Sequence, residues 1–355
     1  QLEMAFHGET PRNFGFPDEP SGYGIYNFSD DVLALSGWYP ILAVYDDQGW
    51  NLDPISAIGD SVYSDAALYR VELDAPAEAV VASTGTVVER QEVDGRANWQ
   101  LVSGPARDFF IALSPDFAAV SREVAGTEIS SYYLPGDEQA GEMALEIAAV
   151  SLETFNERFG AYPYRKLDVV EVPLRYALGV EYPGVILIAS QLYEDTENPS
   201  FAVATAHEVA HQWWYNVVGN DVFDEPWLDE GLTTYSSSLY YETLGGARAA
   251  QGLIGYWRTR YASLLAESAD EPVTETLAYF ESLPEAGVYG GIVYTKGALF
   301  FDALRQEIGD QAFFEALQNY YQGQKYQIAE AEDLLSAFEQ AADRDLDALY
   351  AEWLY

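Results

Sequence analysis

The sequence SFAVATAHEVAHQWWYNVVG, from Ser200 to Gly219, carries a pattern from which both fold and chemistry can be argued. Ser200 is a typical helix N-cap and Gly219 a typical terminator, so we expect a helix from Phe201 to Val218. Within it, His207 and His211 are four residues apart and face the same side, where their imidazole nitrogens can bind one cation. Glu208 lies about 100° further round the helix, within reach of a water on that cation.

An alternative interpretation is that the histidines are two ordinary solvated side chains on a helix surface. The chain has only three histidines in 355 residues. Two histidines and an acid at these offsets then arise by chance in about 0.4% of chains of this composition. The pattern therefore favours a metal site.

The third ligand of such a site is expected to be a carboxylate. The remaining histidine, His7, lies in the N-terminal region, and the chain has no cysteine. The next helix is predicted to begin near Pro226 and to continue to about Tyr241. Four acidic residues lie close to its start: Asp224, Glu225, Asp229 and Glu230.

The segments around this site predict an α+β fold. A stripe of apolar residues at helical spacing indicates a helix from Asp137 to Phe159, which Gly160 ends. The stripe comprises Leu145, Ala148, Leu152, Phe155 and Phe159. Strands are expected at residues 128–134, 167–173 and 184–189, and mostly amphipathic helix from Gly297 onward.

The first third of the chain predicts β-structure. Tyr69, Val71 and Leu73 alternate with Leu68, Arg70 and Glu72, which is the period of a strand. Asp94-Gly95 separates the strand-like runs 86–93 and 96–103 and indicates a tight hairpin. We therefore expect a β-rich N-terminal domain over residues 1–117, followed by a catalytic domain over residues 118–355.

The composition excludes several classes of function. With 58 acidic side chains against 17 Lys and Arg, the formal net charge is −41. Nucleic-acid binding is excluded because phosphates would meet a repulsive field. No apolar run is long enough for membrane insertion. The acidity favours an extracellular or cell-envelope location, or a high-salt environment. The opening from Gln1 lacks signal-peptide features and indicates a processed product or a fragment. No pattern fixes the oligomeric state.

The motif residues resemble the aminopeptidase N and leukotriene hydrolase family of zinc peptidases, in the gluzincin clan. That family's signature is His-Glu-x-x-His, then eighteen residues, then Glu in a Trp-Leu-x-Glu-Gly setting. The same gap here selects Glu230, within residues 227–231, and His211-Gln212-Trp213 also matches. The resemblance implies one zinc ion on His207, His211 and Glu230. It also implies a thermolysin-like mixed α/β catalytic domain with a mostly helical C-terminal half.

Two further segments resemble the family. Its exopeptidase motif, Gly-x-Met-Glu-Asn, matches Gly179-Val180-Glu181-Tyr182-Pro183 with one residue fewer and with Val180 and Tyr182 as departures. The resemblance implies that Gly179 and Glu181 bind the substrate's free amino group. The family's Tyr-x-Lys-Gly motif matches Tyr294-Thr295-Lys296-Gly297 and implies that Tyr294 stabilises the oxyanion. Tyr289 is the neighbour most easily confused with it.

The resemblance covers roughly residues 20–355 and is strongest over 130–310. The family's β-domain is expected to be incomplete here, and the large helical C-terminal domain of many members to be missing. The implied activity is an aminopeptidase that removes N-terminal residues from peptides with a free N-terminus. A zinc-bound water would attack the peptide, with Glu208 as the base. The alternatives are a zinc endopeptidase or other hydrolase on the same scaffold, and a non-catalytic binding module.

Overall fold

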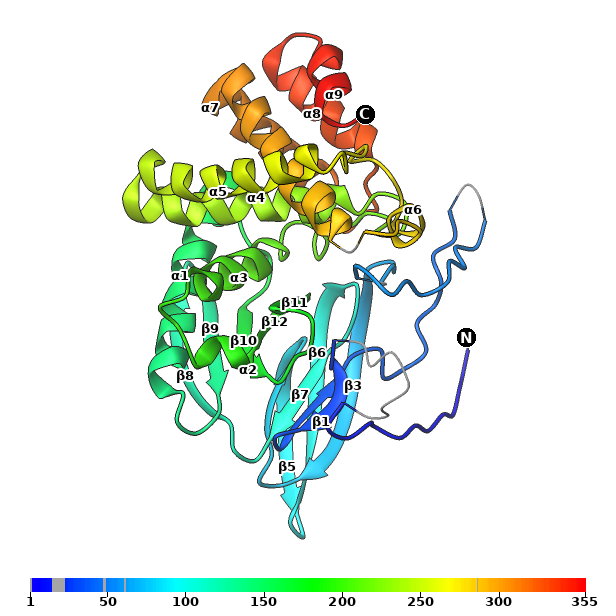
Figure 1. The fold of residues 1–355 in the computed structure, drawn as a ribbon. Coiled ribbons are helices and arrows are strands. Elements are labelled where there is room, and N and C mark those ends of the chain that lie inside the picture. The colour runs from blue at the N-terminus through cyan, green and yellow to red at the C-terminus, as the bar shows by residue number, and fades with distance from the viewer. Residues whose placement is uncertain (1, 15–22, 47–48, 61, 286) are drawn as a thin grey trace. The chain divides into compact units, whose positions relative to one another are not determined.

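The computed structural model describes residues 2–14, 23–46, 49–60, 62–285 and 287–355. The chain forms two compact units that interleave along the sequence (Figure 1). The first unit comprises Gln1–Val44, Ala66–Ala149 and Tyr164–Thr205, and the second Tyr45–Asp65, Val150–Pro163 and Ala206–Tyr355. The predicted domain boundary between residues 117 and 118 stays a prediction.

Two antiparallel sheets make up the N-terminal part of the first unit. Four strands pair in the order β1-β2-β7-β4, and three in the order β3-β6-β5. Trp99, Leu101, Phe109 and Ile111 are buried in the core that the strands enclose. The bounds are β1 Tyr26–Ser29, β2 Val32–Leu35, β3 Ala67–Pro76, β4 Val80–Ser83, β5 Thr86–Val93, β6 Arg96–Ala106 and β7 Ile111–Ser114.

The predicted hairpin is confirmed. Val93 pairs with Arg96 across a two-residue turn, where Asp94 has φ 52° and Gly95 has φ 78°. Positive φ at both central residues is the type I′ turn, whose twist matches the twist of the flanking strands. The alternation along β3 is also confirmed, because Tyr69 and Val71 are half-buried between exposed neighbours.

A five-stranded mixed sheet completes the first unit. Its order is β11-β12-β10-β9-β8, with β9, β10 and β12 parallel and the outer strands antiparallel. The central strands are almost wholly buried, as expected for strands covered on both faces. Strands β9, β10 and β12 confirm the three expected strands, whereas the sequence patterns predict neither β8 nor β11. The bounds are β8 Ala118–Val124, β9 Thr127–Tyr133, β10 Lys166–Val172, β11 Gly179–Tyr182 and β12 Val185–Ala189.

Helix α1, Glu138–Phe159, connects β9 to β10 and confirms the predicted helix. Ala148, Leu152, Phe155 and Phe159 are buried, and Leu145 is half-buried. Gly160 ends the helix with φ 120°, a left-handed conformation that glycine adopts without steric cost.

Helices make up most of the second unit. Helix α4 begins directly after Pro226, as predicted, and extends beyond Tyr241 to Gly245; all of its first fourteen residues are buried. The others are α5 Ala247–Ala266, α6 Leu277–Glu281, the π-helix η1 Gly290–Lys296, α7 Gly297–Gly323, α8 Ala331–Ala342 and α9 Asp347–Trp353. This succession confirms the expected α+β class with a mostly helical C-terminal half. Within the described ranges, no helix combines the length and the apolar character that crossing a membrane requires.

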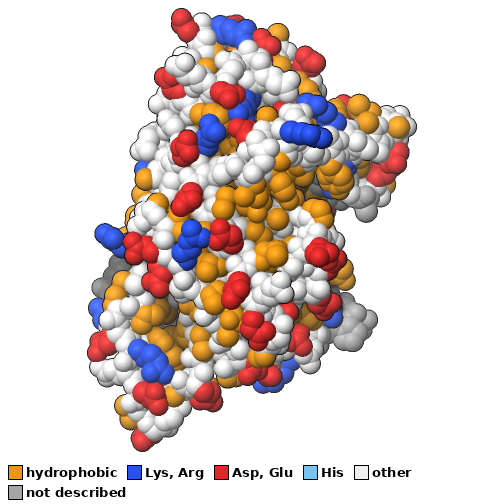
Figure 2. Space-filling view, turned by 90° about the vertical axis from the view of Figure 1, so that its left-hand side faces the viewer, with side chains coloured by type: hydrophobic (Ala, Val, Ile, Leu, Met, Phe, Trp, Pro, Cys, Tyr) orange, Lys and Arg blue, Asp and Glu red, His pale blue; other side chains and the backbone are white. Residues whose placement is uncertain are grey.

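The surface reflects the acidic composition. Asp and Glu side chains are spread over the face drawn in Figure 2 rather than gathered into one patch. Dispersed charge of one sign favours solubility and opposes the binding of anions.

The helix predicted over 201–218 is wrong at both ends. Helix α3 runs from Pro199 to Ala210, preceded by the short α2, Ser190–Tyr193. Asn198 is the cap rather than Ser200, because its Oδ1 accepts the backbone N–H of Ser200 at 3.0 Å. Proline is favoured at the first helical position that follows such a cap.

The early end of α3 follows from the packing of two adjacent tryptophans. The indole N–H of Trp213 donates to the carbonyl of Gly160 at 2.8 Å, and the indole N–H of Trp214 donates to Ser236 Oγ at 3.2 Å. Both side chains are fully buried. These contacts form because the backbone leaves the α-helix after Ala210: the N–H of Trp213 bonds to the carbonyl of Ala210, three residues back. Tyr215 then has φ 88°, which a continuous helix does not permit.

Candidate metal centre

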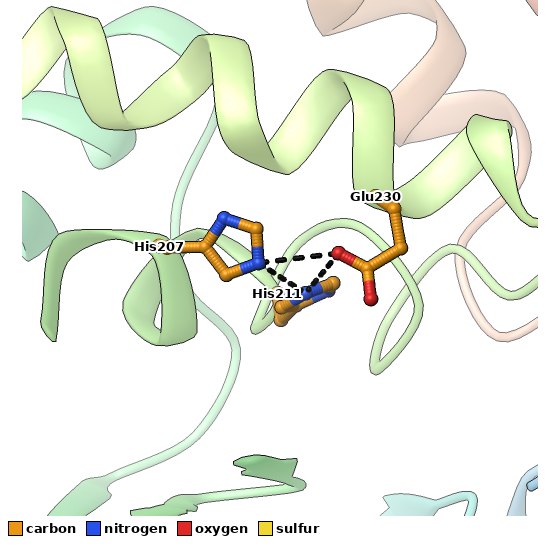
Figure 3. A group of neighbouring side chains, drawn as sticks. All are labelled: His207, His211 and Glu230. Atoms are coloured by element: carbon orange, nitrogen blue, oxygen red, sulfur yellow. Dashed lines mark hydrogen bonds and ion pairs between the residues drawn. The ribbon is translucent and has the colours of Figure 1, made fainter. Parts of the chain in front are cut away.

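The two predicted histidines lie side by side at the end of α3 (Figure 3). His211 directly follows the last helical residue, but its backbone N–H still bonds to the carbonyl of His207 at 3.2 Å. The helical spacing therefore persists through this turn. The Nε2 atoms of His207 and His211 are 3.1 Å apart.

Glu230 reaches the same point from the first turn of α4 (Figure 3). Its Oε2 lies 3.2 Å from Nε2 of His207 and 3.4 Å from Nε2 of His211. A tetrahedral zinc ion with bonds of about 2.05 Å holds its ligand atoms about 3.3 Å apart. The three donor atoms thus already have the mutual spacing of ligands around one such ion.

The other acids near α4 lie in different surroundings. Asp224 is exposed, and Oε2 of Glu225 accepts the backbone N–H of Ala331 at 3.1 Å. Oδ1 of Asp229 accepts from Asn220 Nδ2 at 3.1 Å. Of the four carboxylates that the sequence leaves open, Glu230 is the one brought to the histidine pair.

The electrostatics keep the donor atoms in their metal-binding forms. Burial lowers the pKa of His207, and the neighbouring His211 lowers it further, so its imidazole is neutral at neutral pH. Burial alone would raise the pKa of Glu230. The interactions of Glu230 with His211 and His207 outweigh burial and hold that pKa well below its usual range, so the carboxylate is ionised. A neutral imidazole and an ionised carboxylate are the ligating forms.

A backbone carbonyl orients His211. Its Nδ1 lies 3.0 Å from the carbonyl oxygen of Trp214, and Thr233 Oγ1 is 3.3 Å from the same nitrogen. Because a carbonyl can only accept, Nδ1 carries the hydrogen and Nε2 keeps its lone pair for a cation. No local pattern in the sequence indicates this partner, since the bond depends on the turn that ends α3.

Glu208 lies beside the centre, as predicted. It is on α3 next to His207 and is 5% exposed. One of its carboxylate oxygens lies within 4.8 Å of a ring nitrogen of His211. A carboxylate at this distance can reach a water near the cation without itself completing the ligand triangle.

Tyr294 contacts two members of the triangle. Its hydroxyl donates to Oε1 of Glu230 at 2.5 Å, and its ring stacks on His207 at a centroid distance of 6.0 Å. Burial and the charge of Glu230 raise the pKa of Tyr294 well above its ordinary value. The phenol therefore keeps its proton and remains a hydrogen-bond donor.

Two glycines bring Tyr294 to Glu230. A Cβ on Gly231 would lie 3.3 Å from the Cα of Gly297, so α4 and the start of α7 are in backbone contact. A larger residue at either position would separate the two helices. Lys296 connects the end of η1 to residues 270–271, because its Nζ donates to Asp270 Oδ1 at 2.9 Å and to the carbonyl of Glu271 at 2.8 Å.

The centre also includes an acid that sequence reasoning missed. The side chain of Asp60 hydrogen-bonds to Glu230, and burial followed by the charge of Glu230 raises the pKa of Asp60 to about 7. Asp60 precedes the motif residues by almost 150 positions. No local pattern distinguishes it from the many other acids of the chain.

The two residues predicted to bind the substrate's amino group belong to the first unit. Gly179 and Glu181 lie on β11, where Gly179 pairs with Ile188 and Glu181 with Ile186 of β12. Both are half-buried. Their part in a substrate site stays a prediction.

Comparisons with known proteins agree with this geometry. Peptidase family M1 domain is the family description that matches, over residues 143–353. Aminopeptidase M1-A of Oryza sativa subsp. japonica is 27% identical over 310 residues, which cover 81% of this chain and 34% of that protein. Aminopeptidase N of Streptomyces lividans is 27% identical over 222 residues, which cover 59% and 25%. The chain thus spans about a third or less of the length of these relatives.

A solved structure has the same fold. The M1 zinc metallopeptidase from Deinococcus radiodurans superposes with a TM-score of 0.67 at 23% identity, covering 82% of this chain and 64% of that one. At this identity the likeness shows the fold. The family match extends over more than half of the residues, and the resemblance seen in the sequence is confirmed: the chain belongs to peptidase family M1.

Proposed function

We propose that this chain is a zinc-dependent aminopeptidase that removes N-terminal residues from peptides. The observation that carries the proposal is the triangle of Nε2, Nε2 and Oε2 atoms from His207, His211 and Glu230, with sides of 3.1 to 3.4 Å. Two imidazoles and a carboxylate are a donor set that suits one zinc ion on a thermolysin-like scaffold. The names of the relatives, which are aminopeptidases, support the choice of reaction.

Each residue of the centre has a proposed part in peptide hydrolysis. When bound, zinc supplies a Lewis acid that polarises a carbonyl and lowers the pKa of a bound water towards about 7. Glu208 accepts a proton from the attacking water and returns it to the leaving amine as the C–N bond breaks. The Tyr294 hydroxyl, already held as a donor, stabilises the negative charge that develops on the carbonyl oxygen.

The preference for a free N-terminus depends on two residues of β11. Gly179 and Glu181 are proposed to hold the substrate's ammonium group, which would place the cut after one residue. Their motif departs from the family pattern at Val180 and Tyr182. That departure is the observation in favour of the second candidate, a zinc endopeptidase on the same scaffold.

The acidic surface supports a proposal about location. A net charge of −41 causes self-repulsion, which dissolved salt screens. We therefore propose an extracellular or cell-envelope setting, or one of high ionic strength. Measuring the free energy of unfolding against salt concentration tests this, and a flat or falling curve would contradict it.

Two assays test the activity. Comparing a free-amine aminoacyl-anilide with its N-acetylated form separates the candidates, because an aminopeptidase cleaves only the free amine. Equal rates of cleavage of both substrates would contradict the aminopeptidase and support the endopeptidase. Glu208→Gln should lower kcat by about 10²- to 10⁴-fold, the usual contribution of a general base, while zinc content stays unchanged. Full activity of that variant would exclude Glu208 as the base.

A further inference from the structure

The segment that carries Tyr294 is a π-helical turn. In an α-helix, residues five apart point about 140° away from each other. In a π-helix the hydrogen bonds join residues five apart, and the rings of Tyr289 and Tyr294 accordingly meet edge to face, with centroids 5.6 Å apart. The direction in which Tyr294 points therefore depends on η1 staying π-helical. Because π-helices are rare and short, such a turn needs support from outside its own backbone.

Lys296, the last residue of η1, receives such support. Its side chain is 5% exposed, and its Nζ donates to Asp270 Oδ1 at 2.9 Å and to the carbonyl of Glu271 at 2.8 Å. The hydroxyl of Tyr261, on α5, donates to the same Asp270 oxygen at 3.0 Å, and the ammonium lies 5.8 Å from the centre of the Tyr261 ring. A buried ammonium is costly unless it is paired, so these contacts hold it at one place.

The segment that accepts hydrogen bonds from Lys296 is itself fixed. Oε2 of Glu271 accepts from the hydroxyl of Tyr279, on α6, at 2.5 Å. Val273 is fully buried, and its N–H donates to the carbonyl of Leu354, which follows α9, at 2.8 Å. Contacts with two other parts of the second unit thus hold residues 270–273 in place without the help of Lys296. The two acceptors of the ammonium are therefore a fixed reference for the end of η1.

The other neighbours of η1 make contacts of a different kind. A Cβ on Gly291 would overlap the side chain of Leu264, on α5, and a Cβ on Gly297 would lie 3.1 Å from the Cα of Gly231, on α4. These contacts set how closely the helices approach. Apolar contact is non-directional, whereas hydrogen bonds have a preferred direction. The bonds from Lys296 therefore fix the direction of the turn.

We propose that Lys296 is a positioning residue, whose two hydrogen bonds hold η1 in the π-helical conformation that directs the Tyr294 hydroxyl to the metal centre. This inference rests on the proposed function and deepens it. Tyr294 lies two residues before Lys296; its hydroxyl donates to Oε1 of Glu230 at 2.5 Å and its ring stacks on His207. The hydrogen bonds of Lys296 to described residues include no metal ligand, so it acts on the centre through Tyr294.

A double-mutant cycle tests the proposal in the full chain loaded with zinc. Lys296→Met keeps an unbranched side chain of similar length but removes the ammonium. It should lower kcat on a free-amine anilide about 5- to 30-fold, with KM within about two-fold of the wild type and zinc still stoichiometric, because a small displacement of a catalytic group slows the reaction. In a Tyr294→Phe background it should cause no further loss. Additive losses in the double variant would overturn the proposal.

The exposure of the two charged partners separates this role from a purely structural one. Lys296 is buried, whereas the side chain of Asp270 is 40% exposed and is hydrated once the ammonium is gone. Lys296→Met therefore leaves no buried unpaired charge, and the midpoint of thermal unfolding should stay within about 3 °C of the wild type. An unchanged kcat per folded, zinc-loaded molecule would overturn the proposal.

Asp270→Ala is a second variant, used if Lys296→Met does not fold. It removes a half-exposed carboxylate and one of the two acceptors of the ammonium, while the carbonyl of Glu271 remains. The loss of kcat should be smaller, about two- to five-fold. Unchanged kcat in this variant would then overturn the proposal.

Lys325→Met is the matched control. Its ammonium also lies over a tyrosine ring, 4.4 Å from the centre of Tyr321, but it follows the end of α7 that is remote from η1. The same substitution there removes the same charge from this acidic chain, so kcat should not change. An equal loss of kcat in the control would show that the charge alone is responsible, and the proposal would fail.

A readout independent of activity separates this inference from the proposed function. With 3-fluorotyrosine at position 294, the ¹⁹F resonance should shift on Lys296→Met, in metal-free and zinc-loaded protein, and should not shift on Lys325→Met. An unmoved resonance in Lys296→Met overturns the inference whatever the enzyme does. A shifted resonance in a chain that cleaves no peptide supports the placement of Tyr294 by Lys296 and overturns the proposed function instead.

Discussion

The β5–β6 hairpin and the metal centre differ in what determines their structure. The hairpin is a local structure: Asp94 and Gly95 have the positive φ values that the turn requires, and each strand pairs with its immediate successor. The metal centre draws on the loop at residues 59–60, on α3, on the first turn of α4 and on η1. The turn residues and adjacent strands determine the hairpin, whereas the metal centre requires the packing of the whole helical unit.

The comparison implies that the two regions respond to mutation independently. The hairpin lies wholly in the first unit and the ligand triangle in the second. Effects of substitutions at distant sites without shared partners usually add. Substitutions in the metal centre and in the hairpin therefore test whether the two regions are independent.

The largest effect is expected from Glu230→Gln. Removing the charged ligand oxygen should abolish stoichiometric zinc binding and lower kcat/KM by about 10³-fold or more, since the metal supplies several kcal/mol of transition-state stabilisation. Zinc content by mass spectrometry and anilide hydrolysis provide the measurement. The exposed Asp224→Asn is the matched control and should retain zinc. If both variants kept their metal, Glu230 would not be a ligand.

Tyr294→Phe should have the next largest effect. It removes one proton donor but no ligand, so kcat should fall about 10²- to 10³-fold, the usual result of deleting an oxyanion donor. Zinc content and thermal stability should change little, because the ring still stacks on His207. Loss of zinc in this variant would show a structural role in place of a catalytic one.

Acidification should release zinc at a lower pH than the ordinary pKa of histidine predicts. Burial lowers the pKa of His207 from 6.5, so the neutral imidazole persists as the pH falls and zinc is displaced only below that value. Once the histidine protonates, zinc affinity should fall about ten-fold per pH unit. Through His207 alone, the unfolded chain binds more protons than the folded chain below pH 6.5, so the contribution of this residue to the free energy of unfolding decreases on acidification. Zinc release centred above pH 6.5 in a chelator titration would contradict the lowered pKa.

Gly95→Ala should have the smallest effect on the centre and a clear effect on the hairpin. At φ 78° an alanine is strained, which should cost about 1–2 kcal/mol of stability in thermal or denaturant unfolding. Zinc content and kcat should not change. Gly104→Ala, within β6 and without positive φ, is the control and should cost much less. A fall in zinc binding with Gly95→Ala would show that the two regions are coupled.

The same contrast explains which parts of the fold followed from the sequence. The hairpin, α1 and the parallel strands β9, β10 and β12 were predicted because period, caps and turn residues determine them locally. The end of α3 was not, because a helix-compatible sequence continues to Val218 while the burial of Trp213 and Trp214 requires a turn after Ala210. Tertiary packing overrides local propensity there.

The site was predictable only where its members keep a fixed spacing. His207, His211 and Glu230 follow from a helical repeat and a motif gap, and the structure brings all three together. Asp60 has no local signal, since an acid in a loop is ordinary in this chain. The rings of Tyr289 and Tyr294 are in contact, with centroids 5.6 Å apart, because the segment Gly290–Lys296 is π-helical, and the α-helical period does not predict this contact.

The most direct test of the ligand triangle is a crystal structure of the zinc-loaded chain with anomalous data at the zinc edge. We predict a single peak about 2.0–2.2 Å from Nε2 of His207, Nε2 of His211 and Oε2 of Glu230. A zinc ion bound elsewhere, with the Glu230 carboxylate beyond bonding distance, would contradict the account.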